Sequence, residues 1–254
     1  MLNKIIHGNP TERLPLLIAH GLYGSARNWG VVAKRLSTDR QVVAVDMRNH
    51  GENPWEATHS YYDMAADLAE VIEDIGSPVD LLGHSMGGKA SMVLAAKQPE
   101  LIRRLVIADI APVTYGHSQI RYVTAMQATD LAGVTRRSDA DIRLAETVDD
   151  PALRSFFLQS LDLKSDPPKW RLNLEVLGQS MAEIMGFPEV DGTFDSPTLM
   201  LSGADSDYVS SDHRPRIKTL FPNAKFAKIP GAGHWLHAEK PREFVAAIAA
   251  FLDG

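Results

Sequence analysis

The chain contains no cysteine, and it also lacks several other features that would indicate a particular class of protein. The absence of cysteine among 254 residues excludes disulfides, thiolate metal ligands and a cysteine nucleophile together. No hydrophobic run approaches the roughly 20 residues of a membrane-spanning helix. Basic residues are fewer than acidic ones, 26 against 32, and the net charge is −6. Nucleic acid or an anionic membrane would require a clustered basic surface, so we expect neither as a partner.

The overall composition is that of an ordinary globular protein, with 44% hydrophobic and 23% charged residues. Residues 1–8 lack the apolar core and small-residue cleavage site of a signal peptide, and they resemble a first strand. We therefore expect a cytoplasmic protein. The composition carries no signal for an oligomeric state.

The most informative stretch is VDLLGHSMGGK, residues 79–89. A short apolar run stops at a glycine, and helix-favouring residues follow, so the pattern predicts a buried strand that turns abruptly into a helix. Ser85 lies at the turn, where the backbone is strained and its neighbours come too close for side chains, which explains Gly83 and Gly87. This G-x-S-x-G pattern is typical of a nucleophile elbow.

A second interpretation of the same residues is a phosphate-binding loop. Residues 83–90 come within one residue of the pattern G-x-x-x-x-G-K-[ST]. The mismatch is Ala90, because this position must supply a hydroxyl to the magnesium ion of a bound nucleotide. The mismatch argues against nucleotide binding, and the elbow remains the leading hypothesis.

Strands and helices alternate along most of the chain. Short apolar runs predict buried strands at residues 15–19, 41–45, 79–83, 105–108, 198–203 and 225–229, with helices between them. The alternation predicts an α/β fold with a mostly parallel sheet and helices on both faces. It lapses between residues 114 and 191, where we expect helices at 120–128, 139–147, 151–161 and 172–185. We predict one core domain, residues 1–113 and 192–254, with residues 114–191 inserted as a helical cap.

Four candidate features of a functional site follow different predicted strands. Ser85, Asp109, His234 and the turn at residues 20–22 all lie where a strand ends, and such ends gather at one edge of a parallel sheet. Ser85 is the candidate nucleophile, and His234 is the candidate base that accepts its proton. A serine first, an acid next and a histidine last is the chain order of the α/β-hydrolase triad.

The chain resembles the α/β-hydrolase superfamily over essentially its whole length, and within it the bacterial YbfF-type esterases. The resemblance is carried by HGLYGS (20–25), VDMRNHG (45–51), GHSMGGK (83–89), DIAPV (109–113) and GAGHWLHAEKP (231–241). It implies hydrolysis of carboxylic esters, with thioester or peracid side activities and without a cofactor. A metal site is not expected, because no third ligand lies near His234 and His237.

Backbone groups complete the predicted site. We expect an oxyanion hole made by the N–H groups of Leu22, after the His-Gly turn, and Met86, after the nucleophile. Trp235 and Tyr208 are candidates for the lining of a substrate pocket, although aromatic residues more often belong to a core.

The triad acid is less obvious. The commonest hydrolase pattern places an aspartate three residues after the glycine that ends the penultimate strand, but here that residue is Ser206. Asp205 and Asp207 flank it, and a one-residue slip turns a side chain to the opposite side. We favour Asp109, because its strand is expected beside the one that ends at Ser85, and the YbfF-type resemblance implies the same choice. The alternative role for Asp109 is a structural cap of the turn that follows it.

The sequence thus predicts a serine carboxylesterase that acts through an acyl-enzyme and a Ser-His-Asp triad. A same-fold hydrolase of another bond is the first alternative, acting on a thioester, on a carbon–carbon bond or as a perhydrolase, because fold and triad do not determine the substrate. A small-molecule sensor that keeps the fold and binds without turnover is the second.

Overall fold

The computed structural model describes residues 1–254, which form a seven-stranded sheet covered by helices. The strand order is β1-β3-β2-β4-β5-β8-β9, and only β1 runs antiparallel to its neighbour. The strands are β1 (Lys4–His7), β2 (Leu16–Ala19), β3 (Val42–Val45), β4 (Val79–His84), β5 (Ile102–Ala108), β8 (Thr198–Gly203) and β9 (Ala224–Ile229). The predicted mostly parallel sheet of an α/β-hydrolase fold is confirmed.

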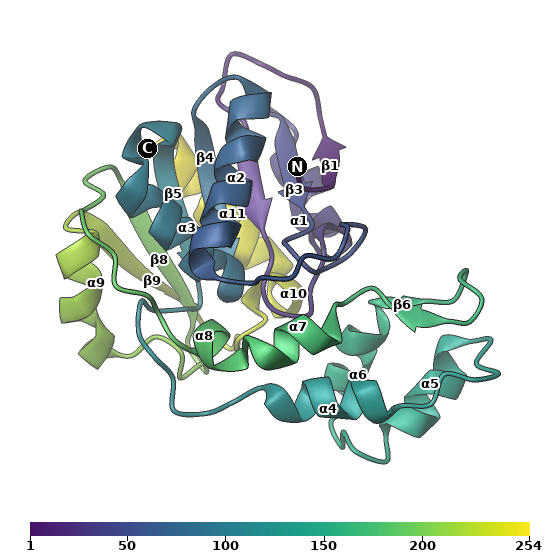
Figure 1. The fold of residues 1–254 in the computed structure, drawn as a ribbon. Helices are drawn as coiled ribbons and strands as arrows, with labels where there is room; N and C mark the ends of the chain where they lie inside the picture. Colours follow the sequence, from purple (N-terminus) through teal and green to yellow (C-terminus); the bar gives the residue numbers. More distant parts are fainter.

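Helices pack on both faces of this sheet (Figure 1). On one face lie α2 (Tyr61–Ile75), α3 (Met86–Lys97) and α9 (Arg214–Leu220); on the other lie α1 (Gly30–Leu36), α10 (Leu236–Glu239) and α11 (Pro241–Asp253). Short 3₁₀ helices occupy Ala26–Trp29, Pro99–Leu101 and Ser211–His213. Successive strand residues point to opposite faces, so Leu17 packs toward α2 and α3, whereas Leu16 and Ile18 pack toward α1 and α11.

The ends of α2 illustrate how local sequence defines an element. The Ser60 side chain accepts a hydrogen bond from the backbone N–H of Asp63, and the Asp63 carboxylate accepts one from the N–H of Ser60. This capping box satisfies two N–H groups that have no partner inside the helix. The helix ends at Gly76, which adopts the left-handed conformation with φ of 79°. Both ends of α2 are therefore defined by residues of the local sequence.

Segment 114–191 leaves the sheet after β5 and returns before β8. It contains α4 (Ile120–Ala128), α5 (Arg137–Leu144), α6 (Pro151–Leu158), the short strands β6 (Leu161–Asp162) and β7 (Lys169–Trp170), α7 (Leu174–Gln179) and α8 (Met181–Met185). In Figure 1 these elements lie together below the sheet. Their buried residues join those of α2 and α3 in one hydrophobic core, so the segment is packed firmly onto the sheet domain.

Three element boundaries in segment 114–191 differ from the predictions. The helix predicted for 151–161 ends at Leu158, because Leu161 pairs instead with Trp170 in an unpredicted hairpin. The helix predicted for 172–185 begins only at Leu174, since Leu172 forms a β-bridge with His50, and it is broken at Ser180 into α7 and α8. The helix predicted for 139–147 lies slightly earlier.

Candidate active site

The turn between β4 and α3 places Ser85 at the carboxyl edge of the sheet. Ser85 has φ of 51° and ψ of −119°, a strained conformation for a residue with a side chain. A Cβ atom on Gly83 would lie 2.5 Å from the carbonyl oxygen of Gly87, and one on Gly87 would lie 2.4 Å from that of Ala19. No side chain fits at either position, which explains why glycine flanks the serine on both sides.

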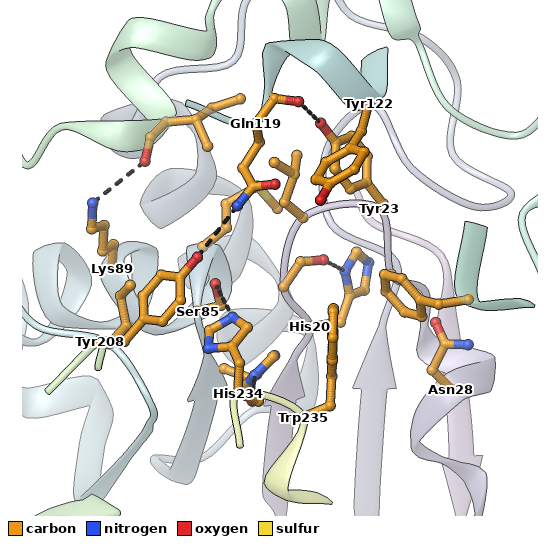
Figure 2. Close-up of a pocket in the computed structure, with 18 of the residues that line it drawn as sticks. His20, Tyr23, Asn28, Ser85, Lys89, Gln119, Tyr122, Tyr208, His234 and Trp235 are labelled. Carbon is orange, nitrogen blue, oxygen red and sulfur yellow. Dashed lines mark hydrogen bonds between the residues drawn. The ribbon is translucent and has the colours of Figure 1, made fainter. Parts of the chain in front are cut away.

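Ser85, His234 and Asp109 form a continuous chain of hydrogen bonds. His234 Nε2 lies 3.1 Å from Ser85 Oγ, a contact drawn in Figure 2, and His234 Nδ1 lies 2.8 Å from Asp109 Oδ2. A carboxylate can only accept, so Nδ1 of the neutral ring carries the proton. The lone pair of Nε2 then faces the serine hydroxyl, as required of a general base.

The Asp109 carboxylate is fully buried and held by two further donors. Its Oδ1 accepts a hydrogen bond of 3.0 Å from the N–H of Gly203, and its Oδ2 accepts one from the Ser206 hydroxyl. The structure therefore brings Asp109 to His234, whereas the side chains of Asp205 and Asp207 are exposed. Ser206 stands where the commoner pattern has the acid, and here it binds the acid instead.

Two residues beside Ser85, Leu22 and Met86, have backbone N–H groups without an intramolecular acceptor. Met86 is the first residue of α3, so its N–H has no acceptor inside the helix, and Leu22 N–H makes no turn or side-chain hydrogen bond. Both residues line the pocket above Ser85. A Cβ atom on Gly21 would lie 3.0 Å from Ser85 Cβ, which places this turn directly against the elbow. Both N–H groups are therefore free to donate to a ligand bound next to Ser85.

Comparison with known proteins identifies the family. A model described as "Alpha/beta hydrolase family" matches residues 16–248. The chain belongs to the α/β-hydrolase family. The Danio rerio protein named "sn-1-specific diacylglycerol lipase ABHD11" is 41% identical over 252 residues, which cover 95% of this chain and 79% of that protein.

Other relatives of this α/β-hydrolase are esterases. "Esterase YbfF" of Escherichia coli is 36% identical over 96% of this chain and 95% of its own length. A solved structure titled "Marine microorganism esterase" superposes with a TM-score of 0.92 at 36% identity and covers 99% of this chain and 100% of that one. The predicted YbfF-type resemblance is confirmed, and the protein is a carboxylic ester hydrolase.

Two buried histidines hold the His-Gly turn of this hydrolase in place. His20 Nε2 accepts from the N–H of Met47 at 2.8 Å, and His50 Nε2 accepts from the N–H of Tyr23 at 3.1 Å. Each ring uses Nδ1–H to donate to a backbone carbonyl, that of Gly21 or Arg48. Burial lowers the pKa of both histidines, so the neutral rings needed for these bonds persist around pH 7.

A third histidine, His84, fixes the backbone of His234. His84 Nε2–H donates to the His234 carbonyl at 2.9 Å, since a carbonyl can only accept. Burial, reinforced by the neighbouring His237 and His234, lowers the pKa of His84 well below its usual range. His237 stacks on Trp29 with ring centroids 4.3 Å apart, and burial lowers its pKa to about 3. His84 and His234 are 150 residues apart, so this contact is visible only in the fold.

The pocket above Ser85 is mostly apolar and has a volume of about 190 Å³. Figure 2 shows Tyr208 and Trp235 beside His234, and both side chains line this pocket, as do Tyr122 and Phe156 from segment 114–191. The rings of Trp235 and Phe156 lie 5.8 Å apart, so the two parts of the chain meet here.

No helix of the protein has the length and apolar character that a membrane span requires.

Lys89, which a phosphate-binding loop would direct at a nucleotide, points instead to segment 114–191. Its Nζ donates to the carbonyl oxygens of Met185, at 3.0 Å, and Gly186, and lies 3.4 Å from that of Ile184. The residue is only 1% exposed and has no carboxylate partner. Lys89 therefore ties the elbow helix α3 to the carbonyl end of α8.

The burial of Lys89 is expected to make the stability of the protein depend on pH. Burial lowers the pKa of Lys89 from 10.5 to about 7, so above that pH the unfolded chain binds a proton that the folded chain has released. Stability contributed by this site should therefore rise with pH across that window. Relative to Lys89→Met, the wild-type free energy of unfolding should increase by about 2 kcal/mol between about pH 7 and pH 9.

Urea unfolding of both proteins at the two pH values measures this difference directly. The Lys89→Met variant serves as the control, because it retains every other titrating group. A difference that stays constant with pH would mean that the three carbonyl acceptors keep the ammonium charged and fully offset its burial.

Proposed function

We propose that the protein is a serine carboxylesterase that hydrolyses small to moderate-sized carboxylic esters through an acyl-enzyme. The observation that carries the proposal is the hydrogen-bonded chain Ser85–His234–Asp109 at the base of an apolar pocket. Esterase and lipase relatives support the same reaction class. The apolar lining supports an uncharged acyl or alcohol group as the occupant.

The mechanism follows from the positions of the groups. Ser85 Oγ attacks the ester carbonyl while His234 Nε2 takes its proton, and Asp109 stabilises the imidazolium that forms. The N–H groups of Leu22 and Met86 donate to the oxyanion of the tetrahedral intermediate. His234 then protonates the leaving alkoxide, which departs as the alcohol and leaves the acyl group on Ser85. Water, deprotonated by His234, attacks this acyl-enzyme and releases the acid.

We further propose that residues 1–113 and 192–254 form the hydrolase core and that segment 114–191 acts as a cap over it. Three contacts support this division. Lys89 binds carbonyl groups at the end of α8, Asn28 Nδ2 donates to Gln159 Oε1, and Tyr23 OH donates at 3.0 Å to the carbonyl of Gln119. The segment thus contacts the core on several sides of the pocket, and its side chains would select the substrate.

Covalent labelling tests the nucleophile directly. Treatment with an aryl alkylphosphonate should add one phosphonyl group per chain, and peptide mass mapping should locate it on Ser85, because the reagent phosphonylates an activated serine. Ser85→Ala should take up no label. Ser211→Ala, which removes an exposed serine away from the pocket, should label as the wild type does. A phosphonyl group on any other residue, or uptake by Ser85→Ala, would contradict the proposal.

A further inference from the structure

Tyr208 lies flat against the imidazole of His234. The two ring centroids are 4.0 Å apart and the planes are inclined by only 22°, and Figure 2 shows the rings side by side. Trp235, by contrast, meets the His234 ring nearly edge-on, with ring centroids 5.9 Å apart. Tyr208 therefore presents the face of its ring to the imidazole.

Contacts on three sides hold Tyr208 in this position. Its backbone carbonyl accepts from Tyr115 OH at 2.8 Å, and its backbone N–H donates to Ser206 Oγ at 3.3 Å. Its hydroxyl accepts from Gln119 Nε2 at 3.3 Å and lies 3.0 Å from His117 Nε2. The loop after β8 and the start of α4 together fix the ring, so its stacking on His234 is built into the fold.

The ring face has a specific effect on a protonated partner. The π-electrons of tyrosine attract a cation that lies over the ring, and this attraction grows where water is excluded. Burial raises the pKa of Tyr208, so its ring stays uncharged when the enzyme works. Imidazolium over this face is therefore stabilised more than neutral imidazole.

Among the other groups around His234, only the Asp109 carboxylate also favours the imidazolium. Asp109 binds Nδ1 through its carboxylate, and Ser85 is a neutral hydroxyl at Nε2. His84 lies 4.8 Å away, and burial lowers its pKa and that of His237, so both rings are uncharged. Asp109 attracts the imidazolium equally in every Tyr208 variant. Differences between these variants therefore report the effect of the ring at position 208.

We propose that Tyr208 is a positioning residue that holds the His234 imidazole and stabilises its protonated form, which occurs in both acylation and deacylation. The inference rests on the proposed function, because it needs His234 to act as the base. The value of kcat/KM rises with pH as the imidazolium loses its proton. Stabilising the imidazolium should therefore place the midpoint of this rise at a higher pH than it would have without the Tyr208 ring.

A series of rings at position 208 tests the electronic part of the proposal without changing the shape. Tyr208→Phe keeps the ring face, and phenylalanines with one and then three ring fluorines weaken its attraction for a cation step by step. The midpoint of the acid limb in kcat/KM should stay near the wild-type value in Tyr208→Phe. It should fall across the fluorinated series by about half a pH unit in total, together with kcat.

Tyr208→Leu removes the ring, and Tyr122→Leu is the matched control, because Tyr122 lines the same pocket without stacking on His234. Tyr208→Leu should lower both the midpoint and kcat. Tyr122→Leu should change KM and leave the midpoint where it is. If the midpoint of the acid limb does not move across the fluorinated series, the proposal is overturned even if kcat falls. Tyr208 would then only pack against His234.

Failure of this inference can be told apart from failure of the proposed function by assaying Ser85→Ala in parallel. Full activity in Ser85→Ala would overturn the serine mechanism itself. An inactive Ser85→Ala protein combined with an unmoved midpoint would overturn only the role of Tyr208.

Discussion

Replacing Ser85 with alanine is expected to lower kcat for an activated ester by about 10⁵-fold or more while leaving the protein folded. The change removes the only oxygen that His234 Nε2 faces, so no acyl-enzyme can form. Catalysis above the uncatalysed rate would then come only from binding and from the N–H groups of Leu22 and Met86. Steady-state kinetics with a p-nitrophenyl ester measures the loss.

Folding of Ser85→Ala can be checked independently of activity. Alanine meets the same backbone strain as serine at φ of 51°, and the Ser85 N–H bond of 3.1 Å to the Ala108 carbonyl remains. The midpoint of thermal unfolding should therefore stay close to that of the wild type. A Ser85→Ala protein that turned over esters at the wild-type rate would refute the assignment of the nucleophile.

The second large effect is expected for Asp109→Asn, which should lower kcat by about 10²- to 10⁴-fold. Asparagine keeps the size of the side chain but loses the charge that stabilises imidazolium. Its amide can also donate to Nδ1, which favours the tautomer with the proton on Nε2. That tautomer cannot accept a proton from Ser85, so both orientation and electrostatic stabilisation are lost.

Asp205→Asn and Asp207→Asn are the matched controls for this experiment. Both carboxylates are exposed and neither contacts His234, so each change should cost less than about tenfold in kcat. The opposite result would contradict our assignment: a large loss of kcat in Asp205→Asn or Asp207→Asn, with Asp109→Asn nearly as active as the wild type.

Local sequence patterns were sufficient for the sheet and the elbow. Strands β2, β4 and β5 each contain a short apolar run that ends at turn residues, which is the usual pattern of a buried parallel strand. The flanking glycines of Ser85 reflect close approach of backbone atoms within the turn itself. The packing of these parallel strands then brings Ser85 and Asp109 to one edge, which topology rules predict.

Local sequence patterns do not predict features that depend on contacts between distant residues. The β6–β7 hairpin forms where residues 161 and 170 gain a partner, and Trp170 Nε1 donates at 2.9 Å to the carbonyl of Met126 in α4. In the sequence, Lys89 belongs to a possible phosphate-binding loop, yet the carbonyl groups that it contacts lie 95 to 97 residues away. Tyr208 was expected only to line the pocket, because ring stacking on His234 has no sequence signature.

The distribution of the site along the chain has a consequence for biosynthesis. Ser85 and His234 are separated by 149 residues, and Asp109 and His234 by 125. A nascent chain that has folded strands β1 to β5 already carries the elbow and Asp109, but His234 has not yet been translated. Such long-range contacts also form slowly, because a long loop must close before they are made. If His234 is the base, as proposed, activity can begin only after translation has passed this residue and the loop after β9 has docked.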